Sequence, residues 1–360
     1  MISNIIKAKD ILAEQGASGL ETAMNADNIF TLDFDGVENI SFASLRTLLN
    51  CYRKGFRFSV INASADVVER FVDSGVSSYI DITRKPKPVD LEKYSIFGEG
   101  YLSKAFNSQD GDSMLKMYGN NMPEEVVIRE KNVARAVLLF GLNTPMVGTV
   151  YDYQGNKCLD FERIEGKRSF SRIISEEPDR IEELSLRFAK MCKQLHSTPC
   201  DTHTFTDRTI IYRNVIASSQ AINEEQKAKV LAFIDSIPKA TTCLHGDLQP
   251  SNVITNGKED FWIDLSDFGY GYPLLDLGMW YFLSCLNPEE LTQHIFHLSQ
   301  DVMRNVWKIF ATEYFGADTP QKQEKARQEV EPFAALHMLY LGSLYGFRPG
   351  MMEFIEKTLL

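Results

Sequence analysis

The chain has 360 residues, of which 44% are hydrophobic and 24% are charged, so its composition is that of a folded protein and not of a disordered one. At roughly 100–200 residues per domain, this length predicts two or three domains. The 38 Lys and Arg against 49 Asp and Glu give a net charge of −11. Because phosphate groups attract positively charged surfaces, this charge argues against a protein that binds nucleic acid or an anionic membrane.

The sequence contains no apolar run near the ~20 residues that cross a bilayer. Its N-terminal residues also lack the apolar core and the cleavage site of a secretion signal, so we expect a cytoplasmic protein. The six cysteines form no CxxC pair, which argues against a zinc site or a disulfide framework and favours reduced thiols. They lie at positions 51, 158, 192, 200, 243 and 285.

Strand-like and helix-like patterns alternate in the first quarter of the chain. Apolar residues alternate at period two over 30–34 and recur at helical spacing over 45–52, and the same two patterns follow at 56–60 and 67–72. A short closing strand is predicted at 79–82. Strands and helices that alternate at this spacing form parallel βαβ units, so we expect a small α/β sandwich.

Two prolines separate this region from the rest of the chain. Pro86 and Pro88 lie among charged residues and break both helices and strands. We interpret 84–92 as a linker between domains, with an ordinary surface loop as the alternative. The first domain is therefore expected to span 1–83.

Two stretches of the first domain resemble the STAS domain of bacterial anti-sigma-factor antagonists. Residues 32–49 read LDFDGVENISFASLRTLL, and residues 58–75 read FSVINASADVVERFVDSG. In that family a strand leads into an Asp-Ser-Ser-Gly turn whose first serine is phosphorylated at the start of a helix. Phe42 occupies that position here, so the resemblance implies a docking surface for the remainder of the chain, a second copy or a protein partner, without the phosphorylation switch. A folding appendage is the alternative, and Ser41 and Ser44 are expected to cap the helix.

Downstream of the linker, the pattern changes from strand-rich to helix-rich. This order predicts an α+β arrangement, with a strand-rich lobe over 93–166 and a helix-rich lobe over 167–360. The expected elements are a β-hairpin region at 94–118, a helix at 124–140, strands at 145–165, and helices from 176 onward with a short β region at 253–265.

The polar sequence HGDLQPSN at 245–252 precedes a predicted hairpin, because an Asn-Gly pair follows between two apolar runs. Asn252 and Asp264 are each six residues from Lys258, so the hairpin should bring them together at its base. An amide oxygen and a carboxylate there are suited to Mg²⁺. Asp247, on the preceding loop, would reach the same cleft, where a carboxylate can orient and deprotonate an attacking hydroxyl.

The sequences HGDLQPSN and IDLSDFGYGYPLLDLG, within 245–278, resemble the aminoglycoside phosphotransferase and choline kinase superfamily, which has a two-lobe protein-kinase-like fold. The resemblance implies ATP as phosphate donor, Mg²⁺ as metal, and the hydroxyl of an aminoglycoside-, choline- or sugar-like small molecule as acceptor. It implies Asp247 as catalytic base, His245 as a loop-organising residue, Asn252 and Asp264 as Mg²⁺ ligands, and Asp276 as a structural anchor of the loop.

Two nucleotide-binding features are expected in the strand-rich lobe. The sequence IFGEGYLS at 96–103 resembles a glycine-rich loop in which Gly98 and Gly100 let the backbone approach phosphate, with a plain hairpin turn as the alternative. The sequence CLDFERIEG resembles the family's hinge. By that resemblance the carbonyl of Glu162 and the amide of Ile164 would bond adenine.

Lys116 lies in SMLKMY, where alternating apolar residues predict a strand, and a cation there can reach the α- and β-phosphates. Glu130, on the predicted helix that follows, is the expected ion-pair partner, with Glu124 and Glu125 as competitors. A solvated surface position is the alternative for both Lys116 and Glu130.

We therefore expect an ATP- and Mg²⁺-dependent small-molecule kinase whose acceptor the sequence leaves open. A regulatory protein that senses nucleotide and a protein kinase are the rivals. The complete set Asp247, Asn252 and Asp264 argues against the first rival, and the lack of an activation-segment pattern argues against the second. The sequence has no GxxxxGK[ST], which argues against a P-loop NTPase.

Overall fold

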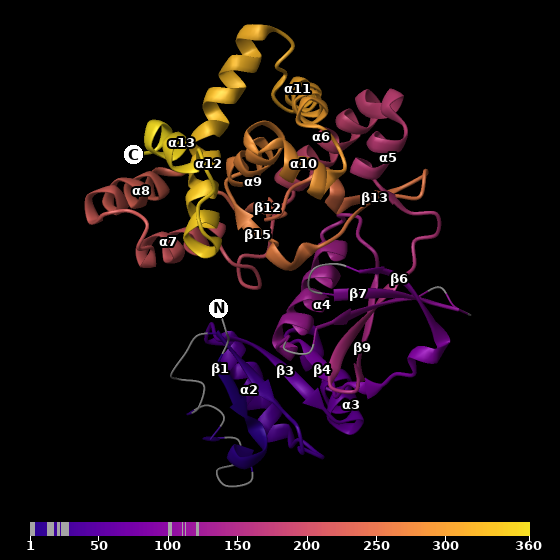
Figure 1. Cartoon of the computed structure of the whole chain (residues 1–360). Helices are drawn as coiled ribbons and strands as arrows, with labels where there is room; N and C mark the ends of the chain where they lie inside the picture. Colours follow the sequence, from indigo (N-terminus) through magenta and orange to yellow (C-terminus); the bar gives the residue numbers. More distant parts are fainter. Residues whose placement is uncertain are drawn as a thin grey trace. The chain divides into compact units, whose positions relative to one another are not determined.

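The structure is a computed structural model that describes residues 4–12, 18–19, 22, 29–99, 103–109, 111, 113–119 and 122–360. Figure 1 labels its helices and strands along the chain. The chain divides into two compact units. Unit 1 comprises Met1–Arg135 and Met146–Arg163, and unit 2 comprises Ala136–Pro145 and Ile164–Leu360.

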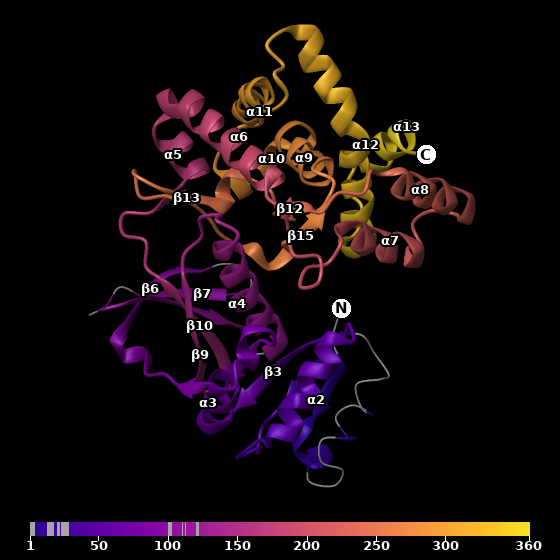
Figure 2. The same ribbon diagram turned by 180° about the vertical axis from the view of Figure 1, so that it is seen from behind.

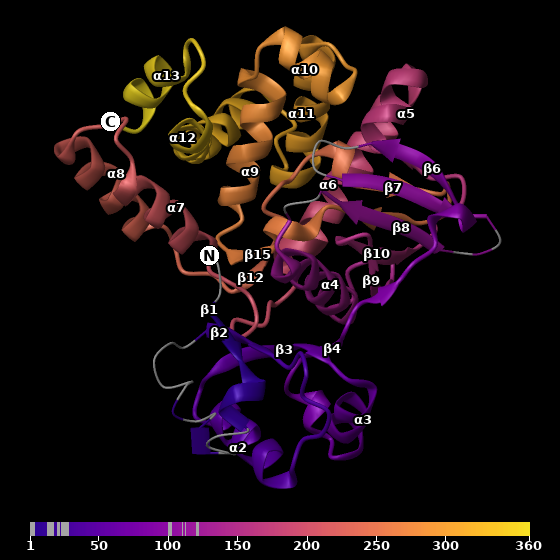
Figure 3. The same cartoon turned by 60° about the horizontal axis from the view of Figure 1, so that its bottom comes forward.

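Unit 1 contains a four-stranded sheet in the order β1-β2-β3-β4, in which all neighbouring strands run parallel. Because consecutive strands are adjacent and crossovers of this kind are right-handed, the helices α2 and α3 lie on the same face (Figure 3). The predicted parallel βαβ arrangement is confirmed, whereas the STAS resemblance stays a prediction. The elements are β1 (Asn4–Lys7), β2 (Ile29–Asp33), α2 (Phe42–Arg53), β3 (Arg57–Ala63), α3 (Ala65–Asp73) and β4 (Ile82–Arg84).

The helix α2 begins at Phe42, as expected, and Ser41 is its N-cap. The Ser41 hydroxyl accepts a hydrogen bond from the Ser44 backbone N–H at 3.1 Å, which satisfies one of the amides that lack a partner in the first helical turn. Phe42 is 64% exposed, and the guanidinium of Arg70 lies 4.4 Å from the centroid of its ring. The buried core of this part includes Leu32, Phe34, Leu45, Leu48, Val60, Val67 and Phe71.

Two boundaries differ from the expectations. The closing strand β4 begins at Ile82 and not at residue 79, because Val76–Ser78 forms a 3-10 turn. Within the expected linker, Lys87–Pro88 forms the strand β5, which pairs with β9. Proline is compatible with this strand because β5 is at the edge of its sheet, where one side of the backbone has no neighbouring strand.

The second sheet of unit 1 has six strands in the order β5-β9-β10-β8-β7-β6, and only β5 and β9 are parallel. Figure 2 shows the helix α4 beside this sheet, and Val127 on α4 shares a buried apolar cluster with Tyr118, Val150 and Leu159. The strands and the helix expected between residues 94 and 165 are confirmed. They are β6 (Tyr94–Glu99), β7 (Ser103–Ser108), β8 (Ser113–Tyr118), α4 (Glu124–Leu139), β9 (Val147–Tyr153) and β10 (Asn156–Glu162).

Unit 2 is mainly helical, as expected, and contains two small β structures. β12 pairs with β15, and β13 lies between β11 and β14. In the described part of the chain, no helix combines the length and the apolar character needed to span a bilayer. The elements are β11 (Arg168–Ser169), α5 (Phe170–Glu176), α6 (Ile181–Ser197), α7 (Arg208–Ser218), α8 (Glu224–Ser236), β12 (Thr242–Leu244), β13 (Val253–Thr255), β14 (Asp260–Trp262), β15 (Gly269–Gly271), α9 (Leu274–Tyr281), α10 (Glu289–Phe296), α11 (Gln300–Phe315), α12 (Pro320–Tyr345) and α13 (Met351–Thr358).

Candidate active site

The hairpin expected after HGDLQPSN is present, because β13 pairs antiparallel with β14. The Ile263 N–H donates to the Asn252 carbonyl at 3.0 Å, so these residues face each other at the base, and Asp264 follows directly. The strands turn around Gly257 and Lys258 instead of Lys258 alone. This shifts the pairing by one residue from the expected register but keeps Asn252 and Asp264 at the same end.

Two side chains hold Asp247, which lies on the loop between β12 and this hairpin. Its Oδ2 accepts hydrogen bonds from Asn252 Nδ2 at 2.8 Å and from Gln249 Nε2 at 3.1 Å. Burial raises the pKa of Asp247 above its ordinary value, although the hydrogen bond from Asn252 acts in the opposite direction. A fixed carboxylate with a raised pKa is better matched to accept a proton from a hydroxyl group.

His245 connects the loop to the second strand of the hairpin and is 0% exposed. Its Nε2 lies 3.1 Å from the Ile263 carbonyl oxygen, and its Nδ1 lies 3.3 Å from the backbone nitrogen of Asp247. Because the amide is a donor and the carbonyl is an acceptor, Nδ1 accepts and Nε2 donates in these two contacts. These contacts hold the loop against the hairpin, in keeping with the loop-organising role that the resemblance implies for His245.

Asp276 anchors the start of the loop from α9. Its carboxylate accepts hydrogen bonds from the backbone N–H groups of His245 at 2.7 Å and Gly246 at 2.9 Å, and lies 3.2 Å from His196 Nε2. Burial alone would raise the pKa of Asp276, but the hydrogen bonds from His196 and Gly246 hold it below its ordinary value. A buried carboxylate with several donors stays ionised. The anchoring part that the resemblance implied for Asp276 is confirmed.

Gly246 lies directly against Asp267. Gly246 has a φ of +83°, and a Cβ added there would lie 2.1 Å from the Asp267 carbonyl oxygen, so no other residue fits without moving the main chain. Asp267 is not among the site residues expected from the sequence. The signal that points to it is a second carboxylate three residues after Asp264, in the same IDLSD segment.

The side chains at the base of the hairpin fit Mg²⁺. Asn252 Nδ2 donates to the carbonyl and the carboxylate of Asp247, which leaves Asn252 Oδ1 as the acceptor that can bind a cation. Asp264 is exposed. Burial lowers the pKa of Lys167 below its ordinary value, and the negative charge of Asp264 acts in the opposite direction. Within the described ranges, no group of three His, Cys, Asp or Glu could hold a metal. Mg²⁺ in proteins is commonly held by one or two protein oxygens together with water and phosphate oxygens, and the pair Asn252 and Asp264 is compatible with such a site.

The ion pair expected in the strand-rich lobe is present in unit 1. Lys116 Nζ lies 2.7 Å from Glu130 Oε1, and Glu130 is 6% exposed. Its competitor Glu124 pairs instead with Lys157 at 3.5 Å. Tyr118, which the sequence analysis missed, donates its hydroxyl to Glu130 Oε2 at 2.6 Å. The role of Lys116 and Glu130 in nucleotide binding stays a prediction.

The remaining nucleotide-binding residues also stay predictions. Gly98 lies on β6 opposite Ala105, next to an irregularity in the pairing. Gly100 lies outside the described residues. Glu162 ends β10, and Ile164 is the first residue after the boundary between the two compact units. This boundary falls within the expected hinge.

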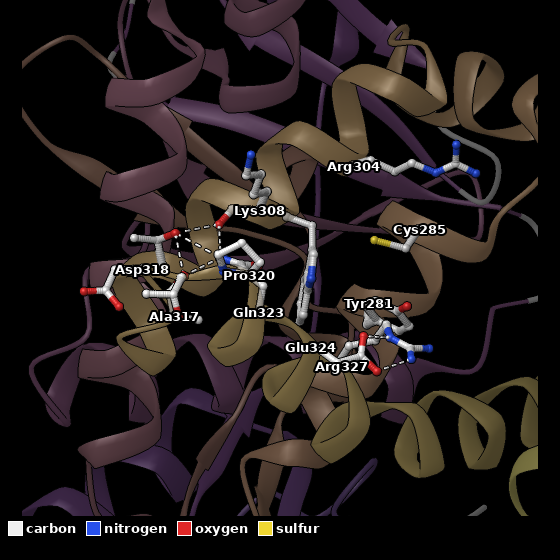
Figure 4. A pocket seen from close by; sticks show the side chains of 13 residues that line it. Tyr281, Cys285, Arg304, Lys308, Ala317, Asp318, Pro320, Gln323, Glu324 and Arg327 are labelled. Carbon is white, nitrogen blue, oxygen red and sulfur yellow. Dashed lines mark hydrogen bonds and ion pairs between the residues drawn. The ribbon is translucent and has the colours of Figure 1, made fainter.

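A separate hollow of about 650 Å³ lies between α11, the start of α12 and the end of α9 (Figure 4). Tyr281, Trp307 and Arg327 are among its lining residues. The lining of this hollow includes no residue of the 245–252 loop and not Asp264.

Residues 147–296 match the phosphotransferase enzyme family in sequence. This segment is less than half of the chain and includes Asp247, Asn252, Asp264 and Asp276. No curated protein sequence matches this chain.

Solved structures similar to this chain include a choline/ethanolamine kinase family protein from Mesorhizobium loti, which is 16% identical, with 74% of this chain and 85% of that chain covered and a TM-score of 0.47. The aminoglycoside phosphotransferase APH(3'')-Id from Streptomyces rimosus is 19% identical, with 67% and 92% covered and a TM-score of 0.42. The complex of gentamicin with APH(2'')-IIa is 16% identical, with 83% and 96% covered and a TM-score of 0.46. The sequence match is the finding that connects the candidate site to a known family.

Proposed function

We propose that the protein is a small-molecule kinase that transfers the γ-phosphate of ATP to a hydroxyl group in the presence of Mg²⁺. The arrangement of the Asp247 loop carries this proposal. It presents a carboxylate of raised pKa, held by Asn252 and Gln249, on a loop anchored by Asp276. The match of residues 147–296 to the phosphotransferase enzyme family supports the same class of reaction.

In the proposed reaction, Asp247 orients the acceptor hydroxyl toward the γ-phosphate and takes up its proton. Asn252 holds Oδ2 of Asp247, so the other oxygen is directed at the hydroxyl. Asn252 Oδ1 and the Asp264 carboxylate would hold Mg²⁺, which neutralises charge on the phosphoryl group. Lys116, oriented by Glu130, would neutralise the α- and β-phosphates.

The remaining proposed contacts concern the nucleotide. Gly98 and Gly100 would let the backbone approach the phosphates, and the main chain of Glu162 and Ile164 would bond adenine. The acceptor would be a small molecule of the aminoglycoside, choline or sugar type.

The test measures ADP release from Mg²⁺·ATP across a panel of amino alcohols, sugars and aminoglycosides, with Asp247→Asn as the matched control. We expect at least one compound to stimulate the parent protein and none to stimulate the variant. ATP binding without stimulation by any compound would favour the nucleotide-sensing rival. Phosphate transfer to a protein substrate would favour the protein-kinase rival.

We also propose that residues 1–83 form a STAS-like domain that keeps a docking surface and lacks the phosphorylation switch. The exposed Phe42 at the start of α2 supports this proposal, because it has no hydroxyl group, while Ser41 caps the helix. The test is incubation with ATP and Mg²⁺ followed by mapping of phosphorylated peptides. Stoichiometric phosphate on Ser41 or Ser44 would contradict the loss of the switch.

A further inference from the structure

Arg208 is a nearly buried cation at the first position of α7, with 5% of its surface exposed. Its Nη1 lies 3.3 Å from Oδ1 of Asp267, whose side chain is 52% exposed. Although burial lowers the pKa of Arg208, the surrounding groups, which include Asp267 and Asp276, raise it above its ordinary value. The side chain therefore stays charged, and a buried charge is stable only where opposite charges and hydrogen bonds accompany it.

The main chain before α7 is joined to β15, which places Arg208 firmly. The Tyr270 N–H donates to the Thr206 carbonyl at 3.2 Å, and Asp207 pairs with Tyr270 as a β-bridge. A Cβ added at Gly269 would lie 2.6 Å from the Thr206 oxygen and 3.0 Å from Arg208 Cδ. The stem of Arg208 therefore lies against the main chain two residues after Asp267.

Asp267 in turn supports the Asp247 loop. Its carbonyl group lies against Gly246, where a Cβ would come within 2.1 Å of the Asp267 oxygen. Gly246 directly precedes Asp247 in the chain. A displacement of Asp267 would therefore move the main chain that carries the Asp247 carboxylate.

We infer that Arg208 is a positioning residue: by holding Asp267 from α7, it fixes the surface on which Gly246 lies and so sets the position of Asp247. The expected effect of Arg208 on catalysis rests on the proposed function, whereas its expected effect on the order of the loop around Gly246 does not. Arg208 precedes Asp267 by 59 residues and belongs to no sequence motif named above.

The experiment compares Arg208→Met and Arg208→Lys with a matched control on the same helix, Arg213→Ala. Arg213 is exposed and pairs with Asp235 on the surface. Methionine keeps most of the length of the side chain and removes its charge. Lysine keeps the charge but lacks the planar fork of donors, so it should restore only part of the effect. The two readouts are amide hydrogen exchange in the peptide that contains Gly246 and steady-state kinetics with Mg²⁺·ATP.

In Arg208→Met we expect exchange around Gly246 to be faster by about tenfold. We expect kcat to fall by about 10²-fold, the loss that a small misplacement of a reacting group produces, while KM for Mg²⁺·ATP stays within about twofold. Arg208→Lys should lie between this variant and the parent, and Arg213→Ala should match the parent. If Arg208→Met fails to fold, Asp267→Ala at the half-exposed partner should show the same faster exchange.

Unchanged exchange in a folded Arg208→Met or Asp267→Ala protein would overturn the inference, whatever the activity. A rise in KM for Mg²⁺·ATP with an unchanged kcat would overturn the inference as well, because a misplaced Asp247 must lower kcat. Faster exchange in a protein whose parent form shows no phosphoryl transfer would sustain the inference and reject the proposed function.

Discussion

The side-chain N–H of Asn252 donates to the carboxylate of Asp247 at 2.8 Å, so the proposed metal ligand also orients the proposed base. Because Asn252 has these two roles, we expect Asn252→Ala to lower activity more than Asp264→Ala, which removes a metal ligand alone. We expect a fall in kcat of about 10²-fold together with an increased Mg²⁺ requirement. Asp264→Ala should increase the Mg²⁺ requirement and weaken nucleotide binding with a smaller fall in kcat at saturating Mg²⁺. Titration of activity with Mg²⁺ distinguishes the two variants. Identical titration curves for Asn252→Ala and Asp264→Ala would contradict the double role of Asn252.

Asp247→Asn should remove phosphoryl transfer and leave the binding of Mg²⁺·ATP nearly intact. The amide cannot take up the proton of the hydroxyl group, and general-base catalysis contributes about 10²–10⁴-fold. The measurements are ADP release for turnover and calorimetric titration for nucleotide binding. A variant that turns over at the parent rate would show that another group is the base.

Tyr118→Phe should destabilise unit 1 without weakening nucleotide binding. The substitution removes a hydrogen bond of 2.6 Å to the buried Glu130 carboxylate. Bonds to charged groups contribute about 1.5–3 kcal/mol to the free energy of unfolding. Lys116→Met should instead weaken nucleotide binding, because it removes the cation itself. Urea unfolding and ATP titration test both variants.

The control for Tyr118→Phe is Tyr79→Phe, because Tyr79 is 59% exposed and its hydroxyl can bond water. This control should leave the free energy of unfolding unchanged. Equal free energies of unfolding of Tyr118→Phe and Tyr79→Phe would contradict the stabilising role of the Tyr118 hydroxyl.

His337 should make the protein less stable in mild acid. It is 3% exposed, its Nδ1 lies 2.9 Å from the Tyr212 hydroxyl, and burial lowers its pKa to about 3. The unfolded chain takes up this proton near pH 6.5, whereas the folded chain does not until about pH 3, so stability falls as the pH drops below 6.5. At pH 5.5 the loss from this residue is about 1.4 kcal/mol relative to neutral pH.

Urea unfolding of the parent and of His337→Gln at pH 7.5 and 5.5 measures this contribution. The loss of stability between the two pH values should be smaller in the variant by about 1.4 kcal/mol. Carboxylates affect both proteins equally and cancel in the difference. An identical pH dependence would show that His337 takes up no proton on unfolding.

The parts of the site that could be predicted from the sequence depend on local geometry. The Asn-Gly pair and the equal spacing of Asn252 and Asp264 specify a hairpin, whichever fold surrounds it. Lys116 and Glu130 are 14 residues apart on a strand and the helix that follows, so few partners compete. These interactions are predictable because the partners are close in sequence and lie on consecutive secondary-structure elements.

The parts that could not be predicted depend on contacts between distant segments. Tyr118 reads as one more apolar residue of a strand, and only the position of α4 reveals that its hydroxyl meets Glu130. Arg208 reads as an ordinary charge at a helix start, because its partner lies 59 residues later. The sequence at Lys87–Pro88 predicts a linker, because proline is excluded from most strand positions. Proline is tolerated in an edge strand, but the sequence does not show which strand will lie at the edge of a sheet.

Gly246 and Gly257 have similar backbone angles, with φ of +83° and +89°, but different surroundings. A Cβ at Gly257 meets no described atom within 4 Å, whereas one at Gly246 meets the Asp267 oxygen at 2.1 Å. In a saturation library, position 257 should therefore accept asparagine and aspartate, which tolerate left-handed backbone, and position 246 should accept glycine alone. The tip of this hairpin is thus the place to attach a spectroscopic label or a short tag that leaves the Asp247 loop undisturbed.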